Sequence, residues 1–410
     1  MRSFCNRILN YETDKKFILL TAIAMFMPFY IGIGVLIVDM FYFVYKSKFR
    51  EIFDKSNLSI LGSLFILYSF LMSIIFNNTY GILATVGILV LFVFVLFIRK
   101  NITEQFMEDI MMIIMVFATF CFLITLTQYS IILKDNSFNY QEFMKYISLH
   151  RTTVGMFFFN ANYYAMVCSL VGIICAYKYF TTESFERGFS FVVGVLSVLT
   201  LLITDSRGAM LSCSVSVFAL TIMLKKRKYT FLILAFAIAF LAYVVAFGKM
   251  DLIPRVDKLG FDMGLRKSIW ISSIEAFKKN LIIGVGPLGI HNIYTTIRDR
   301  VIIHSHNLYL DILVNYGLIG LAMLIPIVYQ LFCEIKALYS RKYTKMIVAM
   351  VIMVLIHSMV DVTIFWTQTS FIFMTFVVGA GALSPAESTE FSLLKKIENA
   401  REKKILDNIK

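Results

Sequence analysis

The chain has 410 residues, of which 59% are hydrophobic and only 16% are charged, and its mean hydropathy is +0.79. Because soluble domains usually carry about 25% charged residues, this composition excludes a water-soluble globular protein and indicates a protein of the lipid bilayer. The net charge of +13 does not predict a nucleic-acid partner, because no basic patch with interleaved aromatic residues occurs and because Lys and Arg collect in the cytoplasmic loops of membrane proteins.

Apolar runs near the length that a bilayer requires, roughly 20 residues each, follow one another along the chain. They predict an all-α polytopic membrane protein with about twelve transmembrane helices. The predicted spans cover, in chain order, residues 17–28, 31–45, 57–76, 81–98, 109–130, 160–178, 188–204, 208–224, 229–247, 306–335, 344–362 and 364–382. The first two share one apolar stretch that is interrupted at Pro28, so a single long kinked helix is the alternative to two helices there.

The distribution of Lys and Arg predicts the orientation, since these residues favour the cytoplasmic side. With the N-terminus in the cytoplasm, the inner segments hold most of the 39 Lys and Arg residues, and the short outer hairpins 77–80 and 363–365 hold none. We therefore expect a multi-pass protein of the cytoplasmic (inner) membrane with both termini cytoplasmic. Residues 1–384 would form a single transmembrane domain, with one large extracytoplasmic loop, 248–305, between spans nine and ten, and residues 385–410 a cytoplasmic basic tail.

The outer loop is basic, which is unusual for an extracytoplasmic segment. Residues 263–279 have the spacing of an amphipathic helix, in which Arg266 lies one turn before Trp270. The planar guanidinium of arginine binds two phosphate oxygens at once, so the loop is either an ordinary solvated segment or part of a site for an anionic substrate. Residues 284–289 fit G-x-G-x-x-G but do not follow a strand of a βαβ unit, so we interpret them as a tight turn.

Two further segments at predicted outer helix ends carry candidate chemistry. The hairpin residue Arg207 is either an anchor at the membrane interface or a second phosphate ligand beside Arg266. His304 and His306 open the next helix, and their spacing is compatible with metal binding, with capping or with a general base that deprotonates a sugar hydroxyl. No acidic or cysteine cluster stands near them in sequence, so we predict neither a metal ion nor a cofactor.

His306-Asn307, nine intervening residues and then Gly317-Leu318-Ile319-Gly320 resemble the signature of the O-antigen ligase and polysaccharide polymerase superfamily. The Ser206–Ala209 stretch and the Arg266–Trp270 segment followed by residues 284–286 are similar to two further landmarks. A fourth landmark is similar to the residues around Asn160 and Asn162, although Ala161 replaces the proline of the pattern. The resemblance runs from about residue 151 to residue 361.

This resemblance implies a membrane-embedded GT-C architecture and a glycosyltransferase that needs no metal. The donor would be an undecaprenyl-diphosphate-linked glycan, and the acceptor a hydroxyl of a glycan or glycolipid on the outer face of the membrane. Arg207 and Arg266 would hold the diphosphate, and His306 would be the catalytic base of an inverting transfer. We add Arg151 as a third cation at the outer edge, with Asn307 and Asn160 in supporting positions.

Three functions remain open at this stage. The leading one is a polymerase of the Wzy type that joins lipid-linked repeat units of a polysaccharide, such as an O-antigen, a capsule or an exopolysaccharide. The second is a ligase that passes a finished polymer to a lipid or wall acceptor. The third is a flippase or transporter of lipid-linked oligosaccharides, although the spans hold few ionisable residues and no inverted repeat, which transporters often have.

Overall fold

The computed structural model describes residues 2–53, 56–135, 157–248, 259–297, 300–338 and 343–383, together with the single residues 139, 142 and 146. Each predicted span overlaps one α-helix of the described residues. These helices are α2 (Thr13–Ala24), α3 (Phe29–Tyr45), α5 (Asn57–Ile75), α6 (Thr79–Asn101), α7 (Glu104–Asp135), α10 (Ala161–Thr181), α11 (Ser184–Ile203), α12 (Arg207–Met223), α13 (Arg227–Ala246), α16 (Leu308–Ala337), α17 (Thr344–His357) and α18 (Thr367–Gly381). The predicted all-α polytopic class is therefore correct, and the predicted cytoplasmic tail, 385–410, lies outside the described residues.

Seven of the described helices, α5, α6, α7, α10, α11, α13 and α16, are long and apolar enough to cross a bilayer. The helices α3, α12 and α17 are apolar but shorter, and α2 and α18 have 12 and 15 residues. A helix rises 1.5 Å per residue, so the shorter helices fall below the roughly 20 residues of a full upright span. The figure of about twelve crossings remains a prediction.

The first apolar stretch forms two helices, which removes the alternative of one kinked helix. Helix α2 ends at Ala24, and α3 begins at Phe29, directly after Pro28. The hydroxyl of Thr21 donates to Asp39 at 2.7 Å, and the hydroxyl of Tyr42 donates to Asp14 at 2.6 Å. Because the earlier residue of α2, Asp14, pairs with the later residue of α3, Tyr42, and the later residue Thr21 pairs with the earlier residue Asp39, the two helices pack antiparallel.

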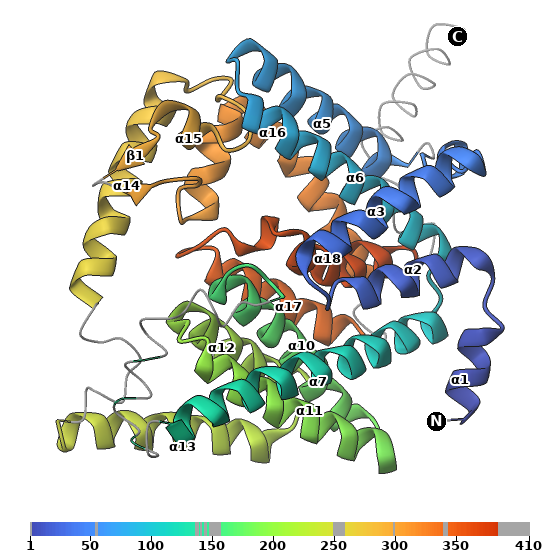
Figure 1. The fold of residues 1–410 in the computed structure, drawn as a ribbon, viewed down its shortest axis with the longest axis vertical. Helices are drawn as coiled ribbons and strands as arrows, with labels where there is room; N and C mark the ends of the chain where they lie inside the picture. The colour runs from blue at the N-terminus through green and yellow to red at the C-terminus, as the bar shows by residue number, and fades with distance from the viewer. Residues whose placement is uncertain are drawn as a thin grey trace, which may run out of the picture.

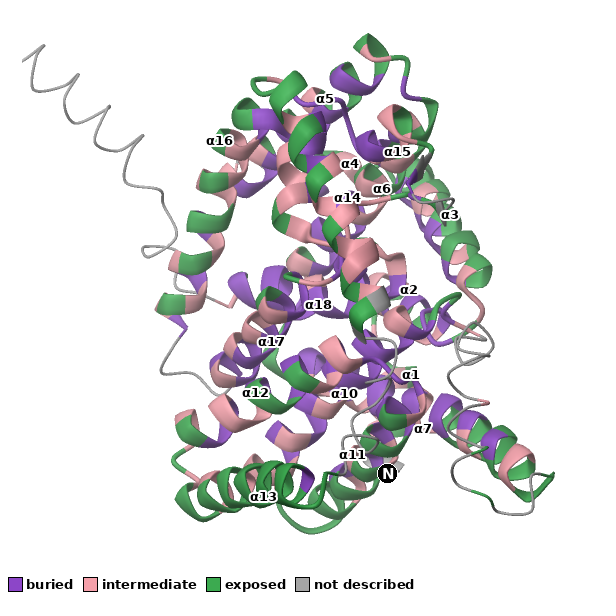
Figure 2. Cartoon of the chain, turned by 90° about the vertical axis from the view of Figure 1, so that its left-hand side faces the viewer, coloured by how far each residue is buried: buried purple, intermediate pink, exposed green. Residues whose placement is uncertain are grey.

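The helices surround a core that is centred on α10 and α18. Figure 1 shows α5, α6 and α16 on one side of α18, and α10, α11 and α12 on the other. In the most apolar 18-residue segment of α10, 72% is buried, whereas in that of α13 only 6% is buried. The green colour of α13 in Figure 2 shows this exposure. Exposed Phe and Leu side chains on α13 are the expected surface of a helix that faces lipid.

Ion pairs join the helix ends that the charge rule assigns to the cytoplasm. Arg7 of α1 (Arg2–Leu9) pairs with Asp109 of α7 at 2.6 Å, and Arg99 of α6 makes two 2.7 Å hydrogen bonds to Glu334 of α16. In Figure 1, α1 lies at the right edge, while α14 (Leu259–Lys279) lies at the left edge. The segments assigned to the two sides of the membrane are thus at opposite ends of the molecule.

The predicted outer loop is folded and has its own small core, so an ordinary solvated loop is the wrong interpretation of residues 259–297 and 300–305. It contains α14, α15 (Gly289–Ile293) and the two-residue strands β1 (Thr296–Ile297) and β2 (Arg300–Val301), which pair antiparallel. Its core consists of Ile269, Ala276, Val285, Ile290, Ile297 and Ile302, packed on Val314 of α16. This core fixes α14 against the transmembrane helices.

The glycine-rich turn 284–286 docks into a break in α16. Gly317 interrupts the helix with φ +60° and ψ −164°, a region that is essentially restricted to glycine. The freed amides of Leu318 and Ile319 donate to the carbonyls of Leu281 and Ile282 at 3.0 Å. The turn that sequence analysis predicted here is confirmed, and it packs against Gly317, the first glycine of the G-x-x-G sequence at residues 317–320.

Candidate active site

The first turn of α16 holds His306 and Asn307 in defined conformations. The side chain of Asn307 caps α16 by accepting from the amide of Leu310 at 3.0 Å, and it donates to the carbonyl of Met359 at 3.0 Å. His306 has φ +48°, a left-handed conformation that is unfavourable for a residue with a Cβ atom. The backbone therefore turns sharply at His306 and directs the imidazole toward the segment that follows α17.

Hydrogen bonds between side chains link His306 to the start of α12. The Nδ1 atom of His306 lies 3.2 Å from Oδ1 of Asp361, and Nδ2 of Asn162 donates to Oδ2 of Asp361 at 2.7 Å. The Oδ1 atom of Asn162 accepts from the hydroxyl of Ser206 at 3.1 Å. Four residues far apart in sequence thus form one connected chain, and Asp361 is at its centre.

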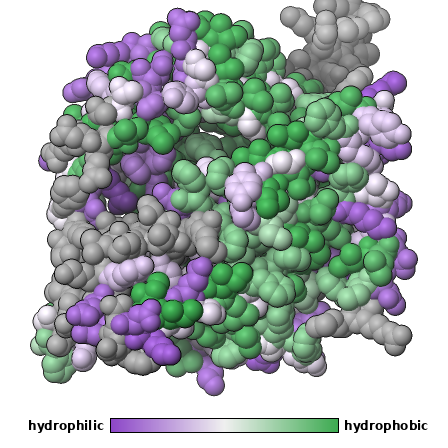
Figure 3. Space-filling model, viewed as in Figure 1, coloured by the Kyte–Doolittle hydropathy of each residue, from purple (hydrophilic) through white to green (hydrophobic). Residues whose placement is uncertain are grey.

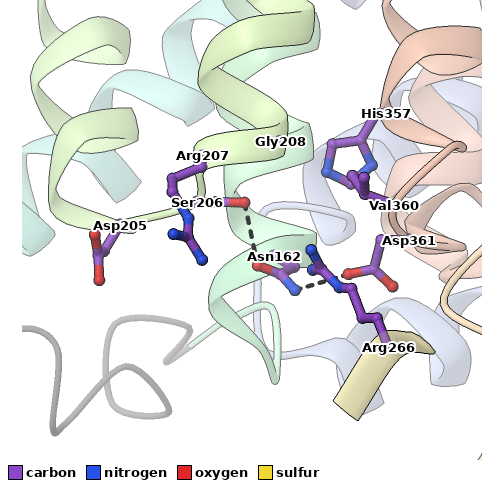
Figure 4. Close-up of a pocket in the computed structure, with 9 residues that line it drawn as sticks. All are labelled: Asn162, Asp205, Ser206, Arg207, Gly208, Arg266, His357, Val360 and Asp361. Atoms are coloured by element: carbon purple, nitrogen blue, oxygen red, sulfur yellow. Dashed lines mark hydrogen bonds between the residues drawn. The ribbon is translucent and has the colours of Figure 1, made fainter. Parts of the chain in front are cut away.

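Both predicted phosphate-binding arginines line one cavity together with Asn162, Ser206 and Asp361 of this hydrogen-bond chain, whereas His306 is not among the lining residues. The cavity has a volume of about 40 Å³, and its walls are Asn162, Asp205, Ser206, Arg207, Gly208, Arg266, His357, Val360 and Asp361. Figure 4 shows Arg207 entering from the start of α12 and Arg266 reaching in from α14 toward Asn162 and Asp361. Figure 3 shows a hollow with hydrophilic walls in this part of the molecule, beside α14.

Arg207 is paired in this state. Its Nη2 atom lies 2.8 Å from Oδ2 of Asp262, which is on α14 one turn before Arg266. The glycine that follows Arg207 permits close packing, because a Cβ atom at Gly208 would lie 2.8 Å from a methyl carbon of Val360. The Arg-Gly pair therefore places a guanidinium where α12 approaches the end of α17.

The amphipathic helix that sequence analysis predicted for residues 263–279 forms α14, and Ile269 and Phe277 pack into the small core. The expected apolar face is wrong at Ile274, which is 40% exposed, and the small residue Ala276 is buried instead.

The charges of the site are set by burial and by the neighbouring imidazoles. Burial favours a neutral Asp361, but the hydrogen bond with His306 and the nearby His304 and His357 keep the pKa of this carboxyl well below its usual range. Burial, together with the adjacent His306, lowers the pKa of His304 to about 4. At neutral pH the site therefore contains a carboxylate at Asp361 and a neutral imidazole at His304.

Within the described part of the chain, His304, His306 and Asp361 form a group that could hold a metal ion. Their candidate ligand atoms all lie within 4.8 Å of one another. This corrects the argument from sequence that the two histidines lack an acidic neighbour, because Asp361 reaches them through the fold. The carboxylate is already engaged by His306, by Asn162 and by the amide of Val362 at 2.9 Å. The absence of a metal ion remains a prediction.

Comparison with known proteins assigns the segment that supplies most of this site. Residues 192–325 match the family model described as O-antigen ligase. The match agrees with the resemblance to O-antigen ligases and polysaccharide polymerases that the sequence motifs indicate. No curated protein matches the sequence of the chain. The matched segment runs from α11 into α16 and includes Arg207, Arg266 and His306.

Two residues of the hydrogen-bond chain lie outside the matched segment. Asn162 at the start of α10 accepts from Ser206, and Asp361 after α17 contacts His306, so both reach the matched segment through hydrogen bonds. Sequence analysis gave Asn162 only as part of a landmark and gave Asp361 no role. The signal for Asp361 was its position at the outer end of a predicted span, where an ionisable residue invites a search for a partner.

The remaining predicted site residues differ in how close the structure places them to the candidate site. Asn160 caps α10 by accepting from the amide of Asn162 at 2.8 Å, which places it next to the site in a structural position. Arg151 lies outside the described residues. Asp262, the ion-pair partner of Arg207, was given no role in the sequence analysis.

Proposed function

We propose that this protein transfers a glycan from an undecaprenyl-diphosphate carrier to a sugar hydroxyl at the outer face of the cytoplasmic membrane, as a polysaccharide polymerase of the Wzy type. The observation that carries the proposal is that Arg207, Arg266 and Asp361 line one cavity. His306 is not among the lining residues, but its Nδ1 atom lies 3.2 Å from Oδ1 of Asp361. Glycan transfer from a diphosphate needs positive charge at the leaving group and a base at the attacking hydroxyl. The positive charge would come from arginines of α12 and α14, and the base from the residue two positions before α16.

The two arginines supply the leaving-group half. Arg207 and Arg266 enter the cavity from different helices (Figure 4), so a diphosphate between them would receive forked contacts from two directions. The negative charge that grows on the phosphate oxygen in the transition state would be stabilised without a metal ion. Helix α12 begins at Arg207, and the positive end of its dipole adds to the same field.

The His306–Asp361 pair supplies the base. When Nδ1 of His306 donates its proton to the carboxylate of Asp361, the Nε2 atom is left as the proton acceptor. The hydroxyl oxygen of the acceptor sugar forms a bond to the anomeric carbon of the donor, and its proton passes to Nε2. The bond from that carbon to the phosphate oxygen breaks, and the electron pair leaves with the lipid diphosphate, which inverts the anomeric centre.

The cavity must open before the donor binds. Its volume of about 40 Å³ accommodates roughly two or three water molecules, and Asp262 occupies Arg207. A diphosphate that replaces the carboxylate of Asp262 would keep Arg207 paired and move α14 outward.

The polymerase is tested by supplying the purified protein with one lipid-linked repeat unit as the sole substrate. A ladder of polymers is the expected result. The description of the family as O-antigen ligase favours a ligase as the second candidate, and a ligase would give product only after a separate acceptor is added. No product under either condition, from a folded protein, would contradict glycan transfer altogether.

A flippase or transporter makes a different prediction for His306. Substitution His306→Ala removes the base but leaves the helix cap at Asn307 in place, so translocation of a lipid-linked oligosaccharide would continue. We expect this variant to lose glycan transfer at normal protein level and with normal delivery of substrate. Retention of transfer would remove His306 from the proposed mechanism.

A further inference from the structure

A second hydrogen-bond chain lies inside the nine-residue spacer between His306-Asn307 and Gly317. Asp311 and Asn315 stand one helical turn apart on α16 and are 2% and 3% exposed. The Oδ1 atom of Asp311 accepts from the amide of Ser305 at 2.8 Å, directly before His306. Its Oδ2 atom accepts from Nδ2 of Asn315 at 2.8 Å, and Oδ1 of Asn315 accepts from the amide of Gly289 at 3.0 Å.

The two ends of this chain belong to the two halves of the candidate site. Ser305 precedes His306, and Gly289 begins α15, just after the glycine turn that follows α14 and its Arg266. Asn315 also holds that turn through its backbone, because its carbonyl accepts from the amide of Gly286 at 2.8 Å. The chain therefore crosses from the base to the element that carries a phosphate ligand.

The hydrogen-bond chain has one allowed order of donors and acceptors. A backbone amide donates at each end, so Asp311 and Asn315 must both present oxygen outward. Between them one side chain must donate and the other must accept, which a carboxylate and an amide satisfy in only one orientation of the amide. With two amides, two buried NH₂ donors would face each other, and with two carboxylates, two buried acceptors would. Either arrangement lowers stability, because buried polar groups are left without a hydrogen-bond partner.

We propose that Asp311 and Asn315 are positioning residues that fix His306 relative to Arg266, and that this accounts for the spacing of the motif. Residues four apart on a helix share one face, so the spacer can hold Ser305 at one end and Gly289 at the other. The buried carboxylate also anchors the sharp backbone turn at His306. This inference rests on the proposed function, because fixing these two groups matters only if both act on one substrate.

The test is a reciprocal exchange of the two side chains. In Asp311→Asn, the new side-chain oxygen can accept from the backbone amide of Ser305 only if the new NH₂ group points toward the NH₂ group of Asn315. In Asn315→Asp, two carboxylates face each other. The double variant D311N/N315D restores the order of donors and acceptors and the formal charge.

We expect each single variant to lower kcat by about 10- to 100-fold, the effect of a small misplacement of catalytic groups. KM for the lipid-linked donor should change by less than about threefold, since the groups that contact the donor remain. The double variant should recover most of kcat. Tyr309→Phe is the matched control, because it removes a hydrogen bond from α16 to the carbonyl of Leu355 that is not part of the Asp311–Asn315 hydrogen-bond chain. Its kcat should stay near that of the wild type.

Amide hydrogen exchange of the peptide that contains Ser305 and His306 is the second measurement, and it does not depend on activity. Exchange should be faster in both single variants and return to the wild-type rate in the double variant. Full kcat in both single variants, or no recovery of either kcat or protection in the double variant, would overturn the inference. If the wild type transfers no glycan while the exchange pattern appears as expected, the proposed function fails and the structural link stands.

Discussion

Asp262 is the ion-pair partner of Arg207 and would compete with the proposed diphosphate. Its carboxylate pairs with Arg207 at 2.8 Å, and both side chains are only about one fifth exposed (22% and 19%). In the proposed mechanism, the diphosphate would displace this carboxylate from the guanidinium.

The substitution Asp262→Asn removes the competing charge and keeps the shape of the side chain. We expect the donor to bind about fivefold more tightly, which corresponds to the loss of an ion pair worth about 1 kcal/mol. Equilibrium binding of the lipid-linked donor measures the change. Glu275→Gln, on the same helix, is the control, and weaker binding in Asp262→Asn would show that Asp262 orients Arg207 instead of competing with its ligand.

Arg207→Lys tests whether the geometry of the guanidinium matters beyond its charge. Lysine keeps the positive charge but has no planar fork for two phosphate oxygens, so we expect transfer to fall by about 10- to 100-fold. The initial rate of transfer from the lipid-linked donor measures this. Arg187→Lys, at an exposed arginine of α11, is the matched control. Near-normal transfer in Arg207→Lys would make Arg207 only an interface anchor.

At the scale of elements, the break in α16 joins the small core of α14, α15 and the β1–β2 pair to the transmembrane helices. A Cβ atom at Gly317 would lie 2.5 Å from the backbone of Gly284 and of Ile282. The same joint is held from α5, where the hydroxyl of Tyr68 donates to the carbonyl of Ile283 at 2.6 Å. The turn after α14 is therefore clamped between two helices.

Gly317→Ala should weaken the contact between α16 and the turn that follows α14. The backbone conformation costs a residue with a Cβ atom about 1–3 kcal/mol, and the contact at 2.5 Å adds to this, so we expect a lower temperature of thermal unfolding and little transfer. The control is Gly87→Ala on α6, where a Cβ atom would meet nothing within 4 Å. An unfolding temperature equal to that of the wild type would mean that α16 re-forms without the break.

The elements also show which features could be predicted from sequence. Each predicted span overlaps one α-helix, because a long apolar run in a bilayer must satisfy its backbone groups internally. The amphipathic helix around Ile269 was predicted, but its core partners Ile290, Ile297 and Ile302 were not, since these short apolar segments have no periodicity of their own. Arg207, Arg266 and His306 were found through motifs, whereas Asp262, Asp311, Asn315 and Asp361 act through partners that are distant in sequence.

At the scale of the whole molecule, the predicted orientation rests on charge. The helix ends assigned to the cytoplasm are tied by buried ion pairs such as Arg99 with Glu334, and the candidate site gathers the opposite ends. This division is what a chain that alternates across the membrane would produce. Which of the two ends faces outward follows only from the positions of Lys and Arg.

Cysteine labelling in spheroplasts tests that orientation. In a cysteine-free background, Val301→Cys introduces a thiol at a position that is 68% exposed in the predicted outer segment, and Leu9→Cys introduces one at a position that is 70% exposed on the predicted inner side. We expect a membrane-impermeant maleimide to label the first in intact spheroplasts and the second only after permeabilisation. The reverse pattern would place the candidate site in the cytoplasm.

The most direct test of the central claim is a structure of the protein with its lipid-diphosphate-linked donor bound. We predict that the diphosphate lies between Arg207 and Arg266 within hydrogen-bond distance of both, with Asp262 displaced from Arg207. We also predict that the anomeric carbon lies on the side of Nε2 of His306, with room for an acceptor hydroxyl between them. A diphosphate that contacts neither arginine, or an anomeric carbon beyond the reach of His306, would contradict the account.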